Sequence, residues 1–442
     1  MLVIKKRKIS SFRLILISFV TVIFLGAFLL MLPISSESGQ WTGFLDALFT
    51  ATSSACVTGL VVVDTATHWS YFGEAVLIVL IQIGGLGVLT VAMMAAVISG
   101  RKIGLFRRTA LQESLGAHAV GGILKLALFI FRVTFTVEII GALVMMPVFV
   151  SDFGLKGVWM SVFHSISAFC NAGFDLMGDM GEFSSLAYYS SDVLINCVIM
   201  FLIISGGIGF LTWDDMIEHK FRFKKYRLQS KVIIVTSLVL TVLPAVYFFF
   251  AEFGHMEMKE RILSSLFQAV TPRTAGFGMC DMSLISPVGL TITVMLMLIG
   301  GSPGSTAGGM KTTTVAVLVF SMFSVFSKKE HTECFGRRID DSIVRNGAAI
   351  LLMYIFLFII SGLVISAVES VPLMHAFFET SSAVGTVGVS LGLTPSLSAL
   401  SKVILMGLMF FGRVGPLTVI FAASTRINQN LSRYPAEKIT VG

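Results

Sequence analysis

Long apolar stretches alternate with short polar segments along the whole chain. Crossing about 30 Å of hydrocarbon takes about 20 residues of helix, and eight stretches are long and apolar enough to do so. They cover residues 12–32, 72–99, 123–150, 193–211, 232–250, 287–326, 348–367 and 400–422. The pattern therefore predicts an all-α membrane protein with eight transmembrane helices in the lipid bilayer.

Basic residues gather at every second connection between these stretches. They comprise Lys5, Lys6, Arg7, Lys8, Arg101, Lys102, Arg107, Arg108, Lys220, Arg222, Lys224, Lys225, Arg227, Lys328, Lys329, Arg337 and Arg338. Because positive loops stay on the cytoplasmic side, both termini are expected in the cytoplasm of a protein of the cell membrane. The first stretch is too long for a signal peptide, and no small-residue cleavage site follows it.

Composition agrees with this class. Of 442 residues, 55% are hydrophobic and 13% charged, and the mean hydropathy is +0.90, whereas soluble domains carry about 25% charge. The net charge of +7 comes from the basic connections, so no nucleic-acid partner is expected. The five cysteines are odd in number and lack metal-ligand spacing, which argues against a disulfide framework or a cysteine metal site.

A short motif recurs four times, each time between two apolar stretches. Each copy begins with phenylalanine, continues through small and hydroxyl residues, and ends at a glycine ten residues later, or nine in the third copy. Glycine adopts positive φ at little cost, and a ring of backbone carbonyls can replace the hydration shell of a cation. The motif thus predicts one cation filter. Its expected residues are Val57, Thr58, Gly59, Asn171, Ala172, Gly173, Thr274, Ala275, Gly276, Thr386, Val387 and Gly388.

Each motif with its flanking stretches reads as helix, pore loop entering from outside, helix. All four units point the same way, which predicts parallel repeats in a pseudo-fourfold arrangement about an axis along the membrane normal. Non-helical backbone at membrane depth needs protein or water around it, so a water-filled central path is expected. The repeats are expected to cover residues 1–110, 111–228, 229–340 and 341–442.

A second, glycine-rich marker recurs in the second stretch of each unit, at residues 83–90, 205–212, 299–306 and 411–418. The third copy contains Pro303 and several glycines, which interrupt a helix. That stretch is therefore expected to form two half-helices joined by a flexible loop beneath the filter, although a kinked helix without a gating role is the alternative. The expected gate residues are Gly300, Gly301, Ser302, Pro303, Gly304, Ser305, Thr306, Ala307, Gly308, Gly309, Lys311 and Arg413.

Arg413 occupies the position that Gly85 and Gly207 hold in the first two units. A charge in the middle of a span is costly and usually functional, and beneath a cation filter a guanidinium raises the barrier to cations. The alternative is a buried ion pair with Glu113 or Asp214.

These filter motifs and the interrupted third marker resemble the Trk/Ktr/HKT superfamily of potassium transporters over nearly the whole chain, and the Ktr transport subunit most closely. The resemblance implies a potassium ion at the filter carbonyls of Gly59, Gly173, Gly276 and Gly388, with 300–309 as the intramembrane gate loop. It also implies a homodimer, a cytosolic ring of nucleotide-binding regulatory subunits, and dependence on the sodium ion. The residues before the glycines differ from those of a potassium channel, so one strong site and looser discrimination among alkali cations are expected.

Two other functions compete with potassium uptake. An enzyme is disfavoured because the seven histidines form no H-x-x-x-H pair and no organic-cofactor motif is present. A secondary transporter of another small solute or cation predicts inverted repeats and a pocket with paired charges, and neither is visible. The chain also lacks a phosphate-binding G-x-x-x-x-G-K-[ST] loop, so any nucleotide control is expected to come from a partner.

Overall fold

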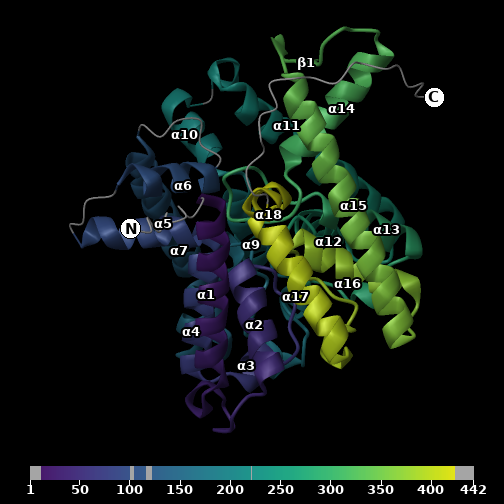
Figure 1. The fold of residues 1–442 in the computed structure, drawn as a ribbon. Coiled ribbons are helices and arrows are strands. Elements are labelled where there is room, and N and C mark those ends of the chain that lie inside the picture. The colour runs from purple at the N-terminus through teal and green to yellow at the C-terminus, as the bar shows by residue number, and fades with distance from the viewer. Residues whose placement is uncertain (1–10, 100–103, 116–121, 221, 424–442) are drawn as a thin grey trace, which may run out of the picture.

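The computed structural model describes residues 11–99, 104–115, 122–220 and 222–423. Lys5 to Lys8, Arg101 and Lys102, on which the predicted orientation partly depends, lie outside these residues. The described chain is mostly helical (Figure 1). An antiparallel pair of two-residue strands, β1 (Glu333–Cys334) and β2 (Arg337–Arg338), departs from the all-α prediction in the connection between the third and fourth units.

Each predicted unit contains a long first helix, a shorter pore helix and an interrupted last helix. In the first unit these are α1 (Ser11–Met31), α2 (Phe44–Cys56), and α4 (Tyr71–Leu86) with α5 (Val88–Ile98), with the short α3 (Thr65–His68) before α4. After α6 (Leu105–Leu115), the second unit has α7 (Ile123–Phe153), α8 (Lys156–Phe169), and α9 (Val193–Gly207) with α10 (Phe210–His219). The third has α11 (Leu228–Tyr247), α12 (Met258–Val270), and α13 (Pro287–Leu298) with α14 (Thr312–Phe326). The fourth has α15 (Asp341–Glu369), α16 (Leu373–Gly385), and α17 (Ala399–Val414) with α18 (Pro416–Ala423).

Four of the described helices are long and apolar enough to cross a membrane alone, namely α1, α7, α11 (with the π-helical turn that continues it) and α15. The pairs α4–α5 and α9–α10 qualify only when each bent pair is taken as one span. The sixth and eighth predicted stretches are divided between shorter helices, so the count of eight spans stays a prediction.

The second stretch of a unit is not one straight helix, contrary to the prediction for the first, second and fourth units. The chain bends by 96° between α4 and α5 and by 97° between α9 and α10. The breaks fall at Gly87, Gly209 and Gly415, which share one position of the second marker and have φ of 85°, 93° and 86°. Because positive φ is incompatible with a right-handed helix and costs glycine little, these glycines end the helices there. The third unit has Pro303 at this position.

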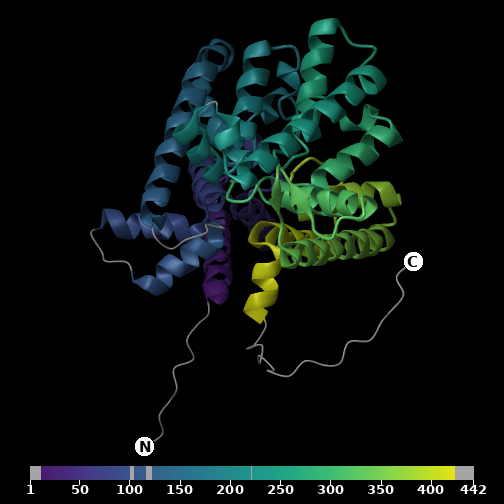
Figure 2. The same ribbon diagram turned by 90° about the horizontal axis from the view of Figure 1, so that it is seen from above.

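The units follow one another around a common centre, as the order of colours in Figure 2 shows. The interrupted helix of each unit packs on the pore helix of the next: α4 on α8, α9 on α12, α13 on α16, and α17 on α2. The last of these contacts closes the circle, and Figure 1 shows α17 beside α2.

The outward faces of the first helices are apolar. Phe28, Leu143 and Phe356 are 62%, 58% and 61% exposed, respectively. Soluble proteins rarely leave such continuous apolar faces in water, whereas a bilayer covers them. The chain is a multi-pass membrane protein.

Candidate functional site

The four motif glycines lie against one another in a closed ring. A Cβ atom built on Gly59 would lie within 3.0 Å of the carbonyl oxygen of Ala172, in the second unit. A Cβ atom built on each of the other three glycines would likewise lie within 3.0 Å of a carbonyl oxygen of the next unit, and the fourth unit contacts the first in this way. These pairs are Gly173 with the Ala275 oxygen, Gly276 with the Val387 oxygen, and Gly388 with the Thr58 oxygen. The ring leaves no room for a side chain at any of the four positions.

The backbone of each filter strand is left-handed at two positions. The glycines have φ of 92°, 69°, 86° and 101°, and the residues two positions earlier have φ of 57°, 59°, 67° and 52°. Those residues are Val57, Asn171, Thr274 and Thr386. Positive φ in β-branched residues is a genuine outlier, and such strain of order 1–3 kcal/mol gathers at functional sites. The sequence pattern placed these four residues in the filter but did not predict their left-handed backbone, because nothing in Val or Thr signals it.

Hydroxyl residues on the pore helices hold the strands. The carbonyl of Ser53 accepts a hydrogen bond from the Thr58 amide (2.8 Å), and its hydroxyl accepts one from the Gly59 amide (3.1 Å). Ser382 holds Val387 and Gly388 in the same way, at 2.8 Å and 2.9 Å. In both strands the amides are therefore bonded to the pore helix of the same unit.

The second and third strands use the same residue type differently. The Ser167 hydroxyl donates to the Phe174 carbonyl (2.6 Å), and the Thr271 hydroxyl donates to the Phe277 carbonyl (2.6 Å). Both therefore fix the residue after the glycine. Every motif has a serine or threonine four residues after its phenylalanine. The sequence therefore contained this signal, but its role could not be assigned without the geometry.

The carboxyl end of each pore helix leads directly into its strand: α2 ends at Cys56, and α16 ends at Gly385. A helix carries about half a negative charge at that end, so four such ends around one ring favour a cation. The hydroxyls of Thr58, Thr274 and Thr386 are buried without a hydrogen-bond partner among the described residues.

A cavity of about 620 Å³ lies on the side of the ring where the strands end. It is lined by the four filter glycines and by carboxylate residues from three units, Asp64, Asp175 and Asp281. Burial raises the pKa of the Asp175 carboxyl to about 6. Carboxylate groups from three of the four units thus line the approach to the ring, an arrangement that suits a cation.

The segment between α13 and α14 crosses beneath the other side of the ring. A Cβ atom on Gly308 would lie within 3.0 Å of the Thr386 hydroxyl, which belongs to the fourth strand. The Thr306 hydroxyl lies 2.9 Å from the Asn171 side-chain oxygen and 3.0 Å from the Phe169 carbonyl, at the second strand. The segment thus contacts opposite strands of the ring from below.

This segment is more tightly held than the expected flexible loop. The Ser302 amide donates to the Gly207 carbonyl (3.0 Å), and the Gly309 amide donates to the Gly412 carbonyl (3.1 Å). Lys311 folds back, and its Nζ donates to the Ala307 carbonyl at 2.8 Å. Backbone contacts to the second and fourth units therefore fix the loop in this state, and Lys311 closes it on itself.

Arg413 joins three units through main-chain carbonyls. Its guanidinium donates to Thr306 in the loop, and to Gly84 and Gly85 at the end of α4, the last at 3.0 Å. This differs from the suggested ion pair with Glu113 or Asp214. Asp214 lies 3.9 Å from Arg227, and Glu113 is an exposed residue of the cavity that Arg413 also lines. The carbonyls at the end of α4 carry the negative end of a helix dipole, which suits a guanidinium.

A second cavity, of about 200 Å³, lies below the loop and is lined by Arg413, Lys311 and Thr90. The order is therefore the larger cavity, the ring, the loop and then the smaller cavity. All twelve expected filter residues belong to the four strands around the ring, and the expected gate residues of the third and fourth units lie together beneath it.

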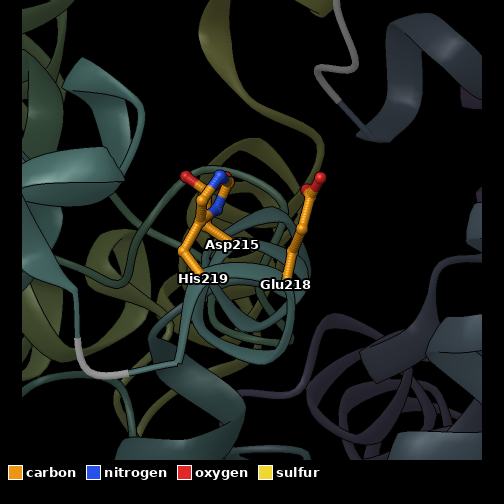
Figure 3. Close-up of side chains that lie close together, drawn as sticks. All are labelled: Asp215, Glu218 and His219. Atoms are coloured by element: carbon orange, nitrogen blue, oxygen red, sulfur yellow. The ribbon is translucent and has the colours of Figure 1, made fainter.

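One group in the described part of the chain has the residue types of a metal site. Asp215, Glu218 and His219 project from α10 in Figure 3, with ligand atoms within 4.8 Å of one another. Asp215 is already engaged, because it accepts from the Arg227 amide (3.1 Å) and the Ser230 hydroxyl (2.5 Å) and lies 3.3 Å from Nε of Arg227. It thus ties α10 to the start of α11, and these contacts need no metal.

Residues 7–433 match the TrkH family, described as cation transport proteins. The chain belongs to this family. Membership confirms the resemblance on which the sequence analysis drew and the expectation of a transporter rather than an enzyme.

Two relatives of this TrkH-family protein match it over its whole length. It is 38% identical to the potassium/sodium uptake protein NtpJ of Enterococcus hirae, with 100% of both chains covered. It is also 38% identical to the Ktr system potassium uptake protein B of Bacillus subtilis, with 100% of this chain and 98% of the relative covered. The potassium transporter TrkH of Vibrio parahaemolyticus has a similar solved structure, with TM-score 0.76 and 18% identity over 95% of this chain and 86% of that one. This last likeness supports the fold.

Proposed function

We propose that this protein takes up potassium ions across the cell membrane through the ring of four filter strands. The observation that carries the proposal is the closed circle of contacts from Gly59 through Gly173 and Gly276 to Gly388 and back. Four strands with glycine at the same depth supply carbonyls around one axis, and such carbonyls replace the hydration shell of K⁺. The pseudo-fourfold arrangement of the four units accounts for the ring, and uptake by both relatives supports the choice of ion.

The loop of residues 300–309, with Lys311 and Arg413, is proposed as the gate. It contacts two filter strands from below, so an ion leaving the filter meets it directly. Arg413 adds positive charge and ties the loop to α4. For ions to pass, the loop must leave its contacts with Asn171 and Thr386.

We further propose that a cytosolic ring of nucleotide-binding regulatory subunits controls this gate. The transporter itself is proposed to act as a homodimer, with both termini in the cytoplasm. Support for a further component comes from the names of three relatives, which call them proteins B and D of a Ktr system. Sodium dependence is also proposed, on the name of the Enterococcus relative.

Uptake measurements in cells that lack their own potassium uptake systems test the proposal. The chain should restore growth at low K⁺ and take up K⁺ and Rb⁺ in preference to Na⁺, and a co-expressed cytosolic subunit should increase the rate. Correctly inserted protein that moves no K⁺, with or without the subunit, would refute it. Uptake of an unrelated solute instead would favour the secondary-transporter alternative.

A further inference from the structure

A buried acid of the fourth pore helix is bonded to the chain that follows its filter strand. Glu379 lies on α16 and is 0% exposed. Its Oε1 accepts from the Ser390 hydroxyl at 2.6 Å and from the Leu391 amide at 3.1 Å. Its Oε2 accepts from the Thr394 hydroxyl at 2.5 Å. Three donors from one short segment therefore converge on a single side chain of the pore helix.

These bonds act on the filter through a short length of chain. Ser390 follows Gly388 by two residues, which span at most about 7 Å. The Ser390 hydroxyl also accepts from the Gly392 amide at 2.9 Å, so a second bond holds the same turn. Gly388, Ser390 and Gly392 all line the larger cavity. The acid therefore fixes the wall of that cavity directly after the filter glycine.

The same helix also holds the filter glycine itself. Ser382, three residues after Glu379 on α16, accepts from the Gly388 amide at 2.9 Å. Residues three apart on a helix lie on one face. One face of α16 therefore bonds both the filter glycine and the segment that follows it. The fourth strand cannot shift without breaking bonds to this helix.

The other units hold this part of the chain less firmly from the corresponding position. Every motif has a polar residue directly after its phenylalanine, and these residues are Thr50, His164, Gln268 and Glu379. The Thr50 hydroxyl instead bonds the Asp46 carbonyl of its own helix at 2.8 Å. Nε2 of His164 accepts from the Leu176 amide at 3.3 Å, and Nε2 of Gln268 lies 3.6 Å from the Met282 sulfur. The fourth unit has the shortest contacts from this position to the chain after the strand.

The fourth strand is also one that the proposed gate touches. A Cβ atom on Gly308 of the loop would lie within 3.0 Å of the Thr386 hydroxyl. Movement of the loop therefore changes the packing beneath this strand. An anchor on the other side of Gly388 keeps the strand in place when the loop leaves this contact.

From these contacts we propose that Glu379 is a positioning residue that sets the K⁺ affinity and ion preference of the filter by holding residues 390–394, and through them Gly388, on α16. The inference rests on the proposed function and adds to the filter a residue outside the four strands. The role needs acceptor oxygens and no net charge. A hydroxyl can donate or accept, so the Thr394 contact forms whether or not the carboxyl carries a proton.

The test breaks the link from each side. Glu379→Leu removes the acceptors, and the double variant Ser390→Ala/Thr394→Val removes the two hydroxyl donors while leaving the acid in place. Initial rates of K⁺ and Na⁺ uptake would be measured in proteoliposomes with matched amounts of inserted protein. Each variant should raise the KM for K⁺ about tenfold and weaken the preference for K⁺ over Na⁺. The maximal rate should change less than about twofold, because the loop is untouched.

A combined variant and a matched control sharpen the result. All three substitutions together should raise the KM no further than either variant alone, because each breaks the same link and residues in contact are not additive. Thr50→Val is the control. Thr50 holds the corresponding position in the first unit, and its hydroxyl bonds within its own helix, so the KM should stay at the wild-type value.

A wild-type KM and ion preference in both variants would overturn the proposal. So would a lower maximal rate at unchanged KM, which is the mark of a purely structural role, or effects that multiply in the combined variant. Where Glu379→Leu does not insert, the double variant decides in the same way. A wild-type chain that takes up no K⁺ removes the proposed function itself, whereas K⁺ uptake with an unchanged KM in the variants removes only the role of Glu379.

Discussion

The filter ring is built from four repeated strands, whereas the loop beneath it is a single element without a counterpart in the other units. The ring is made four times from one motif, with the same two left-handed positions in every strand. The loop occurs once, in the third unit, and its contacts reach strands two and four through different groups. Repetition surrounds an ion evenly, which suits selection. A single asymmetric element can move without dismantling the ring, which suits gating.

The two regions also differ in what holds them. Filter strands are fixed by backbone amides bonded to the pore helix of their own unit, as with Ser53 and Gly59. The loop is held by other units, and Arg413 links it to α4 through a single side chain. Changes at the ring should therefore alter which ions pass and how tightly they bind, whereas changes at the loop should alter how fast they pass.

The largest effect is expected at the filter glycines. Gly388→Ser would place a Cβ atom within 3.0 Å of the Thr58 carbonyl at a φ of 101°, and left-handed backbone costs a side chain about 1–2 kcal/mol. We expect the KM for K⁺ to rise at least about tenfold, with weaker discrimination against Na⁺, in uptake assays. Gly122→Ser is the control, because Gly122 has a φ of 81° and a Cβ atom built there would meet no described residue within 4 Å. Equal effects at both positions would mean that backbone strain alone is responsible.

Removing the loop should have the next largest effect. Deleting residues 301–308 joins Gly300 to Gly309, whose backbones are already adjacent, since the Gly300 amide donates to the Met310 carbonyl at 2.8 Å. We expect the cation flux to rise roughly tenfold, equivalent to a barrier lower by about 1.4 kcal/mol, and dependence on a cytosolic partner to fall. Lower flux from normally inserted protein would make the loop a structural support of the filter.

Arg413→Ala should act in the same direction and less strongly. It removes the link from the loop to Gly84 and Gly85, and hydrogen bonds to charged groups contribute about 1.5–3 kcal/mol each. We expect roughly fivefold faster flux with unchanged ion preference. Arg413→Lys is the comparison, since lysine keeps the positive charge but lacks the guanidinium group whose two nitrogens donate to separate carbonyls. A membrane yield that collapses for Ala and not for Lys would instead assign Arg413 to stability.

The smallest effect is expected from the hydroxyls that hold the strands. Ser382→Ala leaves the Gly388 amide without its acceptor, and one such hydrogen bond is worth about 0.5–1.5 kcal/mol. The KM for K⁺ should rise roughly threefold. Ser54→Ala is the matched control, because the Ser54 hydroxyl bonds only within its helix, to the Thr50 carbonyl. A KM that moves in neither variant would mean that the strands keep their shape without these hydroxyls.

The sequence predicted the repeated parts best. Glycines at one place in four motifs are strong signals, because few other residues fit that backbone, and all four lie in the ring. Pro303 and its glycines likewise predicted the interruption between α13 and α14. Arg413 stood out because a charge in a span is rare.

What the sequence could not predict depends on contacts between units. Gly87 and Gly209 read as parts of continuous spans, since the hydrophobic pattern runs through them and only the left-handed backbone reveals the bend. The carbonyl partners of Arg413 have no side-chain signature, so the search for a partner acid suggested Glu113 and Asp214, whereas the guanidinium bonds to main-chain carbonyls. Asn171 and Thr306 are 135 residues apart, and neither predicts the other. The number of spans and the bounds of the repeats remain predictions.

The most direct test of the central claim is to locate the ion. Anomalous diffraction from crystals grown in Rb⁺ or Tl⁺ would show whether these heavy analogues of K⁺ bind within the ring. The account predicts a peak on the axis between Gly59, Gly173, Gly276 and Gly388 that is lost in Gly388→Ser and kept in Arg413→Ala. A peak elsewhere, or one that survives the serine substitution unchanged, would contradict it.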